Sequence, residues 1–237
     1  MKGNLLYEGK AKQVFRVEGN DTHLILSYKN DATAFNGKKK ASFIGKGKYN
    51  NQISAKVFEF LQEKGIASHF VRSLNETEQL VEKTTIIPVE VVVRNTAAGS
   101  ITRRLGIQEK SEFSPPLVEL FYKNDVLGDP LINDEHALLL SDVTPAELLD
   151  IKEMALNVND HLKQFFENID LTLADFKLEF GRNIEGRIIL SDEVSPDTCR
   201  LWDKETGEKM DKDVFREDLG DLLYVYDNIL QRLEATV

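Results

Sequence analysis

The chain is poor in the residues that build disulfide frameworks and zinc sites. Cys199 is its only cysteine, and its four histidines are dispersed along 237 residues. A single cysteine cannot form an intrachain disulfide, and the histidines lack the close spacing of zinc ligands. The Gly-x-Ser-x-Gly elbow of serine hydrolases and the P-loop pattern are absent as well. These absences disfavour a disulfide-stabilised domain and leave any chemistry to other residues.

Long apolar runs and an excess of positive charge are also missing. No stretch approaches the roughly 18 apolar residues of a membrane-spanning helix, and residues 1–8 lack the apolar core of a signal peptide. With 30 Lys and Arg against 40 Asp and Glu, the net charge is −10, which disfavours broad affinity for nucleic acid. We therefore expect a cytoplasmic protein that contacts neither membranes nor nucleic acid.

The first part of the chain has the pattern of a β-rich lobe. Runs of β-branched and aromatic residues between turn signals predict strands over 13–17, 23–28, 69–73, 79–83 and 89–95. The apolar period predicts one helix over 49–64. Because proline is disfavoured inside a central strand, we place a boundary near Pro88, between lobes 1–87 and 88–237.

The second part is richer in helix. Thr144-Pro-Ala-Glu147 is a capping box with proline at the first helical position, and an apolar stripe continues to Ile169. A second stripe from Phe215 to Leu233 predicts another helix that begins at Asp211. The whole pattern indicates an α+β protein, with a mainly antiparallel β first lobe packed against a mixed α/β second lobe.

Two carboxylates, Glu179 and Asp192, form the most informative candidate site. Asp175, Lys177 and Glu179 alternate with apolar residues, so a strand would place three charged side chains on one face. If the Glu-Gly pair at 185–186 is a two-residue hairpin turn, Glu179 lies directly opposite Asp192. Opposed side chains have Cβ atoms about 4.5–5.5 Å apart. Two like charges there require a cation, and Mg²⁺ is the most plausible one.

The alternative is a hairpin with a solvated polar face, balanced by Lys177 and Arg187. Glu-Gly is a poorer hairpin turn than Asn-Gly, and a one-residue bulge would break the pairing. Spacing alone leaves both interpretations open.

Several basic segments could meet anions. Gly9-Lys-Ala-Lys12 places two lysines at alternate positions beside a glycine that allows close backbone approach. Five lysines between 38 and 48 form a glycine-flanked basic stretch, which we interpret as a loop. Arg94–Ser100 indicates a strand, a tight turn and a short helix, with a guanidinium suited to phosphate or carboxylate, and Arg200 could bind another anion. Each segment is also compatible with an ordinary solvated surface.

Together these segments resemble the phosphoribosylaminoimidazole-succinocarboxamide synthase (SAICAR synthetase) family. The resemblance runs in order over essentially the whole chain, at the length of the bacterial single-function members. It rests on Gly9–Lys12, Pro88–Ser100, Asp175–Gly181, Ser191–Asp197 and Arg200–Lys204. It implies a fold with ATP between two lobes, distantly similar to protein kinases, and a homodimer.

The resemblance also implies an activity and the residues that perform it. The family is an ATP-dependent ligase of de novo purine biosynthesis that joins 5-amino-1-(5-phosphoribosyl)imidazole-4-carboxylate (CAIR) to L-aspartate, giving SAICAR, ADP and phosphate. By motif, ATP would meet Lys10, Ala11, Lys12, Val81 and Ile86, and Mg²⁺ would be held by Glu179 and Asp192. The substrates would meet Arg94, Ser100 and Arg200, more weakly Lys123 and Arg216, while Lys177 and Asp175 would be catalytic. Some relatives have aspartate where this chain has Asn36, which leaves an acidic role there open.

The implied chemistry suits these residue types. A carboxylate resists attack by an amine because it is anionic and lacks a good leaving group. Phosphorylation makes its carbon electrophilic and supplies phosphate as the leaving group. Such a transfer needs a metal, cations around the phosphoryl oxygens and reactants held in line. We hypothesise an acyl phosphate that the aspartate amine attacks, although amine addition before phosphorylation stays open. Asp175 could be the general base, or it could hold Lys177 by charge pairing.

Two other functions compete with this interpretation. A kinase-like phosphotransferase is disfavoured because Glu193-Val194, rather than Phe-Gly, follows Asp192 and no His-Arg-Asp loop occurs. A non-catalytic nucleotide-binding module is disfavoured because Lys177 and both carboxylates are present.

Overall fold

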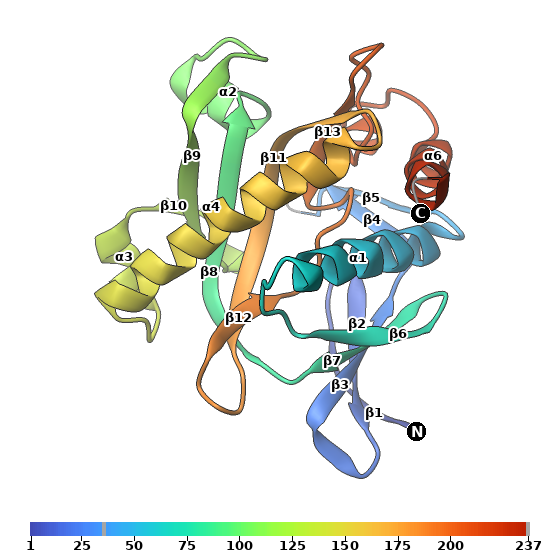
Figure 1. The fold of residues 1–237 in the computed structure, drawn as a ribbon, viewed down its shortest axis with the longest axis vertical. Helices are drawn as coiled ribbons and strands as arrows, with labels where there is room; N and C mark the ends of the chain where they lie inside the picture. The colour runs from blue at the N-terminus through green and yellow to red at the C-terminus, as the bar shows by residue number, and fades with distance from the viewer. Residues whose placement is uncertain (35–36, 236–237) are drawn as a thin grey trace.

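A five-stranded antiparallel sheet forms one end of the molecule (Figure 1). The computed structural model describes residues 1–34 and 37–235. The order is β1 (Lys2–Glu8), β2 (Lys12–Val17), β3 (Asn20–Tyr28), β7 (Glu78–Glu82) and β6 (Phe70–Asn75). Every neighbouring pair runs antiparallel, as predicted for the first lobe.

A second sheet of six strands forms the middle of the molecule. Its order is β10 (Leu131–Ile132), β9 (Glu112–Tyr122), β8 (Thr85–Thr96), β11 (Leu171–Arg182) and β12 (Ile188–Ser191), with β13 (Cys199–Asp203) also paired to β11. β12 pairs with the C-terminal part of β11 and β13 with its N-terminal part. The segment 192–198 between them therefore returns along the middle of β11, where Lys177 N donates to Thr198 O at 2.9 Å. A small hairpin, β4 (Asp31–Ala34) and β5 (Lys39–Ser42), stands apart from both sheets.

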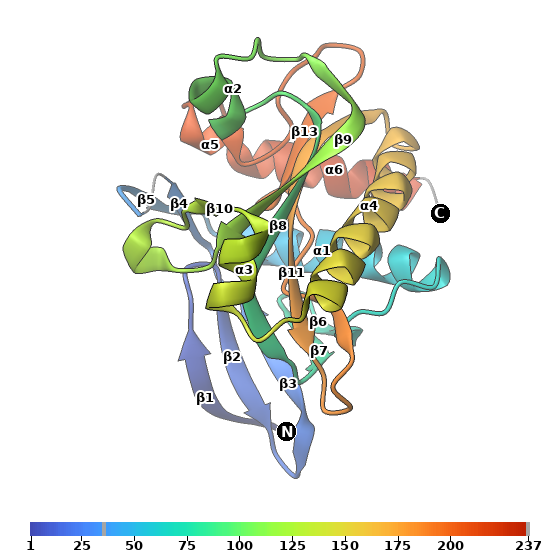
Figure 2. The same ribbon diagram turned by 90° about the vertical axis from the view of Figure 1, so that its left-hand side faces the viewer.

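Among the described residues, two long helices pack on the sheets and a third packs against one of these two helices. They are α1 (Lys46–Glu63), α4 (Pro145–Glu167) and α6 (Leu222–Ala235), and the short ones are α2 (Ser100–Leu105), α3 (Asp134–Leu140), α5 (Asp213–Arg216) and the 3₁₀ turn η1 (Asp125–Leu127). Figure 2 shows α4 lying across the face of β8 and β11. That face supplies apolar side chains to one main core, which includes Val89, Val91 and Val93 of β8, Leu178 and Phe180 of β11, and Ile53, Val57 and Phe58 of α1. The six-stranded sheet thus shares the main core with α1, which Phe70 of β6 also joins, while Leu26, Tyr28 and Val81 of the five-stranded sheet form a separate small cluster.

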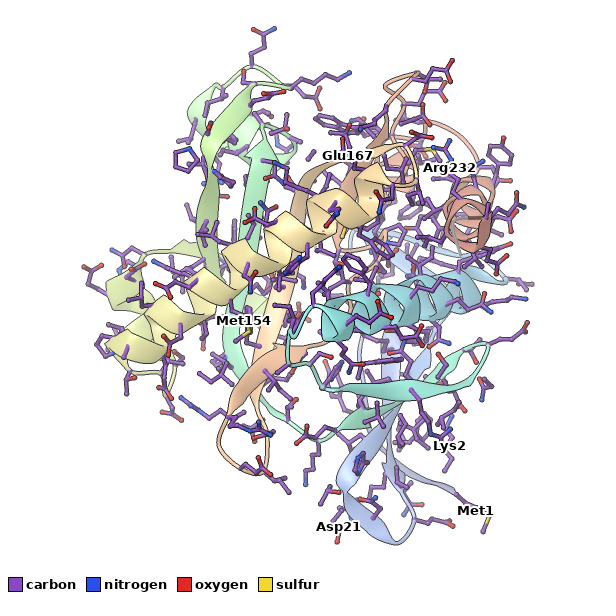
Figure 3. The ribbon with its side chains drawn as sticks, viewed as in Figure 1. Met1, Lys2, Asp21, Met154, Glu167 and Arg232 are labelled. Carbon is purple, nitrogen blue, oxygen red and sulfur yellow. The ribbon has the colours of Figure 1, made fainter. Side chains whose placement is uncertain are left out.

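Local signals at helix ends are mostly confirmed. Thr144 Oγ accepts from Glu147 N at 3.3 Å and Glu147 Oε2 accepts from Thr144 N at 2.8 Å, which is the predicted capping box of α4. Beyond the C-terminal end of α4, Arg232 of α6 donates to the carbonyl of Ile169 (3.2 Å) and to Asp203 (2.7 Å), and so ties α6 to the end of α4 and to β13 (Figure 3).

The predicted single C-terminal helix is wrong. It divides into α5 and α6, because Asp218 and Gly220 have positive φ values of 55° and 156° and interrupt the helical path. Asp221 then begins α6 by accepting from Leu223 N at 2.9 Å. Leu219, which the periodic pattern assigned to the buried face, is exposed.

The predicted strand break at Pro88 is also wrong. β8 runs through Pro88, and its pairing with β11 shifts between Glu179 and Gly181. A bulge of this kind lets a central strand hold a residue without an N–H. The chain changes sheet earlier, between β7 and β8. Among the described residues, none of the helices combines the length and apolar character that crossing a membrane requires.

Candidate active site

A pocket of about 780 Å³ lies between the two sheets. The structure brings every residue predicted for the site to its lining: Lys10, Ala11, Lys12, Val81, Ile86, Arg94, Ser100, Lys123, Asp175, Lys177, Glu179, Asp192, Arg200 and Arg216. These residues come from both sheets and from the segments that follow them. The sequence motifs therefore meet in one place.

The wall formed by the five-stranded sheet is apolar. Val14 of β2 lies opposite Leu26 of β3, and Leu24 of β3 lies opposite Val81 of β7. All four side chains line the pocket and belong to, or pack against, one small apolar cluster. We call these four residues the apolar wall. This apolar surface is suited to the face of an aromatic base rather than to a charged group.

The opposite wall, on β8 and β11, is charged. The predicted alternation is confirmed, because Asp175, Lys177 and Glu179 all line the pocket. The antiparallel register sets Arg94 opposite Asp175 and Glu90 opposite Glu179. We call these five residues the charged wall. Alternate residues of the same two strands enter the core beneath α4.

The predicted hairpin register is wrong by one residue. Glu179 pairs with Ser191, because the turn is a three-residue loop between Asn183 and Arg187. Asn183 Oδ1 accepts from the backbone of Glu185 (3.1 Å) and Arg187 (2.9 Å). Gly186 takes a φ of 79°, as the last residue of such loops usually does. Asp192 therefore lies just beyond β12 and is not a cross-strand partner of Glu179.

Asp192 still points into the pocket, by a different route. Its φ is 63°, which turns the chain out of the strand. Its Oδ1 lies 2.6 Å from Lys12 Nζ, and the same ammonium lies 2.9 Å from Glu193 Oε1. Burial would raise the pKa of Asp192, but Lys12 and then Lys177 outweigh it and hold this pKa well below the usual range. Lys12 thus joins the five-stranded sheet to the segment after β12, while Lys10 pairs with Asp125 at 2.6 Å.

The carboxylate that faces Glu179 is Glu90, which the sequence analysis missed. Lys177 Nζ lies 2.6 Å from Glu90 Oε1 and 2.9 Å from Glu179 Oε1, and Lys123 Nζ lies 2.7 Å from Glu179. Burial would lower the pKa of Lys177, but Glu179 and Glu90 raise it well above its ordinary value. Lys177 is therefore a fixed positive charge and cannot serve as a base near neutral pH.

The pocket offers few protein ligands for a metal ion. Among residues 1–34 and 37–235, no group of three or more His, Cys, Asp or Glu side chains is arranged to hold one. Glu179 and Asp192 do supply two carboxylates to the same pocket. Mg²⁺ commonly takes only one or two protein carboxylates and completes its shell with substrate phosphates and water. The residues therefore fit Mg²⁺ bound together with a nucleotide, and they do not form an all-protein metal site.

At the far end of the charged wall, Asp175 joins two guanidinium groups. Asp175 Oδ2 accepts from Arg94 at 2.6 Å and from Arg200 at 3.0 Å. Arg94 also donates to Ser100 Oγ at 3.2 Å. The expectation that Asp175 pairs with Lys177 is not met. A carboxylate that accepts from two guanidiniums is well placed to orient them.

The neighbourhood of Arg200 is closely fitted. Arg200 Nε donates to Asp213 at 2.8 Å, and Asp213 also binds Arg216. Gly99 has a φ of 64°, and a Cβ atom there would overlap the Arg200 guanidinium, which Asp175 and Asp213 hold in place. Glycine is therefore required beside this guanidinium. Three arginines and a serine hydroxyl thus converge on one end of the pocket.

The predicted basic loop at 38–48 does not exist as a loop. Its residues form β5 and the start of α1. Lys46 is fully buried and pairs with Asp197 at 2.7 Å, and Lys39 pairs with Asp218 at 2.6 Å. Lys46 and Lys39 are therefore already paired with carboxylates of the chain. Asn36 lies outside the described residues.

Comparisons with known proteins agree with this geometry. A model of the SAICAR synthetase family matches residues 5–233. Phosphoribosylaminoimidazole-succinocarboxamide synthase from Oceanobacillus iheyensis is 63% identical over 237 residues, which is 100% of both chains. A solved SAICAR synthetase in complex with ADP superimposes with a TM-score of 0.93 at 48% identity, covering 97% of each chain. The Ehrlichia chaffeensis enzyme gives a TM-score of 0.95 at 43% identity, over 98% of this chain and 99% of its own.

Proposed function

The chain belongs to the SAICAR synthetase family, and we propose that it joins CAIR to L-aspartate while ATP is cleaved to ADP and phosphate. The product is SAICAR, an intermediate of purine biosynthesis. The observation that carries this proposal is the pocket between the two sheets, which is lined by an apolar wall and a charged wall. One wall suits the base of ATP, and the other suits reacting carboxylates and phosphates.

ATP would lie with its adenine on the apolar wall, between Val14 and Val81. It would also lie beside Ile86, near the segment where the chain passes from β7 to β8. Its phosphates would then extend toward Lys10, in the turn between β1 and β2, and Lys12, the first residue of β2. Mg²⁺, when bound between Glu179 and Asp192, would neutralise phosphate charge and hold the terminal phosphoryl group in position. When ATP binds, the Lys12 ammonium would contact the incoming phosphates as well as the carboxylates of Asp192 and Glu193.

CAIR would bind at the other end of the charged wall. Arg94, Arg200 and Ser100 offer donors that suit its phosphate, and Arg216 adds a further charge nearby. Asp175 holds Arg94 and Arg200 in one orientation. This placement would direct the imidazole carboxylate toward Lys177, between the two substrates.

The chemistry that follows is a phosphoryl transfer and an amide formation. A CAIR carboxylate oxygen attacks the terminal phosphorus of ATP, ADP leaves, and an acyl phosphate forms. The aspartate amine then attacks the acyl carbon, the C–O bond to phosphate breaks, and the amine loses a proton. Lys177 remains charged in this scheme, so its role is to stabilise the negative charge that develops on the oxygens.

Release of ADP tests the proposal directly. Steady turnover should require CAIR and L-aspartate together, and it should yield one phosphate for each ADP. Robust turnover that ignores aspartate would instead identify a kinase-like phosphotransferase. Binding of ADP without any turnover would identify a nucleotide-binding module.

We also propose that the enzyme is a homodimer of the cytoplasm. The stretch from η1 to α3 leaves Val126, Leu127, Leu131 and Leu139 exposed, and surface apolar side chains of this kind are commonly covered by a partner. The free, buried Cys199 agrees with a reducing compartment. Light scattering should give twice the mass of one chain, 26.9 kDa, and a single-chain mass would refute the dimer.

A further inference from the structure

His69 contacts helix α1, the end of β7 and the segment that carries Asp192. It has no role in the chemistry described above. Its side chain is 4% exposed, and Nε2 lies 3.0 Å from the backbone oxygen of Asp192. A carbonyl oxygen can only accept, so Nε2 carries the hydrogen. The ring packs edge-on against Phe58 of α1, with centroids 5.5 Å apart.

The backbone of His69 is held from both sides as well. His69 N donates to Leu190 O at 2.8 Å, and His69 O accepts from Glu82 N at 2.6 Å. Leu190 belongs to β12, just before Asp192, and Glu82 ends β7 beside the crossing between the sheets. His69 is therefore fixed relative to both the apolar wall and the segment that carries Asp192.

The backbone of Asp192 turns sharply where β12 ends. Its φ of 63° lies in the left-handed region, which aspartate tolerates better than most residues with a side chain. The His69 hydrogen bond goes to the carbonyl of this turn residue. It thus favours the turn that directs the Asp192 carboxylate into the pocket rather than along β12.

We propose that His69 is a positioning residue that acts through Asp192. By holding the Asp192 carbonyl, it fixes the direction of the carboxylate and so couples the binding of metal to the binding of nucleotide. This inference rests on the proposed function of the pocket as a magnesium–nucleotide site. It predicts that loss of the donor weakens nucleotide binding only when the metal is present.

Two amide substitutions separate this role from packing. In His69→Gln the amide nitrogen can occupy the place of Nε2, whereas in His69→Asn it is too short to reach Asp192. Calorimetry would measure ADP binding with excess Mg²⁺ and with EDTA. The ratio of the two affinities should fall about tenfold in His69→Asn, the effect of one lost hydrogen bond, and should largely persist in His69→Gln. ADP binding in EDTA should change little in either variant.

Phe58→Leu provides the matched control for packing. This substitution removes the ring that contacts His69 but leaves the donor in place, so it should lower the melting temperature without changing the affinity ratio. If His69→Asn does not fold, His69→Phe keeps the ring shape without the donor and should show the same loss. An unchanged ratio in the donor-less variants, or an equal fall in Phe58→Leu, would overturn the proposal.

The proposed function can fail separately. If the wild-type protein binds ADP more tightly with Mg²⁺ but shows no turnover with CAIR and aspartate, the ligase assignment fails and the role of His69 is still measured. If Mg²⁺ gives the wild-type protein no advantage in ADP binding, the coupling does not exist and the inference about His69 is refuted.

Discussion

The five-stranded sheet presents the apolar wall to the pocket, while β8 and β11 of the six-stranded sheet present the charged wall. On the apolar wall each side chain contributes by burial alone, which has no direction and is roughly additive. On the charged wall Lys177 lies between Glu90 and Glu179, and Asp175 lies between Arg94 and Arg200. Removing one member there leaves buried partners unbalanced, so we expect larger and less additive effects.

The largest effect is expected from the centre of the charged wall. Lys177→Ala should lower kcat/KM about a thousandfold, the usual scale for a donor aimed at transition-state charge. Steady-state release of ADP measures this loss. Lys163→Ala, on an exposed position of α4, is the matched control and should leave the rate unchanged. A fall of less than tenfold in Lys177→Ala would remove this residue from the reacting centre.

The metal end should follow closely. Asp192→Asn keeps the size of the side chain but removes the charge that fits Mg²⁺. The expected fall in kcat/KM is about a hundredfold or more, and it should not be recovered in excess Mg²⁺. Measuring the rate across a Mg²⁺ titration checks both statements. Turnover at the wild-type rate in high Mg²⁺ would show that Asp192 holds no metal.

Asp175→Asn distinguishes two roles for Asp175, another member of the charged wall. If Asp175 orients Arg94 and Arg200, the substitution should raise KM for CAIR by about tenfold or more and change KM for ATP little. If Asp175 is the general base, kcat should fall and KM should stay the same. Separate titrations of CAIR and ATP decide between these outcomes.

The apolar wall should respond mildly. Leu24→Ala removes part of the surface proposed for adenine, and we expect KM for ATP to rise about fivefold with kcat unchanged. Val14→Ala should act in the same direction, and the double substitution should give nearly the product of the two effects. A large loss of kcat would contradict the comparison between the walls.

The smallest effect is expected far from both walls, at the start of α4. Arg182 and then the hydrogen bonds from Thr144 lower the pKa of Glu147 from 4.5 to about 2. A lowered pKa in the folded protein stabilises it above the ordinary pKa, and this contribution is lost as the pH falls toward the folded value. The melting temperature of Glu147→Gln should therefore lie slightly below that of the wild type near pH 7, and the two should converge near pH 2. Activity should be unaffected.

The sequence predicted those parts of the site that depend on local pattern. Alternation in β11 was sufficient to place Asp175, Lys177 and Glu179 on one face, because the period of a strand is fixed by its backbone. The capping box of α4 was equally local. The motifs that carry the family resemblance also proved to line one pocket.

What could not be predicted depends on contacts distant in sequence. Glu90 faces Glu179 only because β8 pairs with β11 in one register. The local sequence of either strand does not predict that register. The hairpin turn was misjudged because the Asn183 amide closes a three-residue loop, although Gly186 was a usable signal for it. His69 showed no motif at all, since its role depends on a single backbone carbonyl.

Strand β11 serves two purposes on its two faces, with charged residues toward the pocket and Leu178 and Phe180 toward α4. Because neighbouring residues point in opposite directions, deleting one residue within the strand would exchange the faces beyond that point. Charges would then enter the core, and aromatic rings would fill the pocket. An insertion or deletion within β11 would therefore impair folding and activity together. The exposed loop 184–186 can change in length without exchanging the two faces of β11.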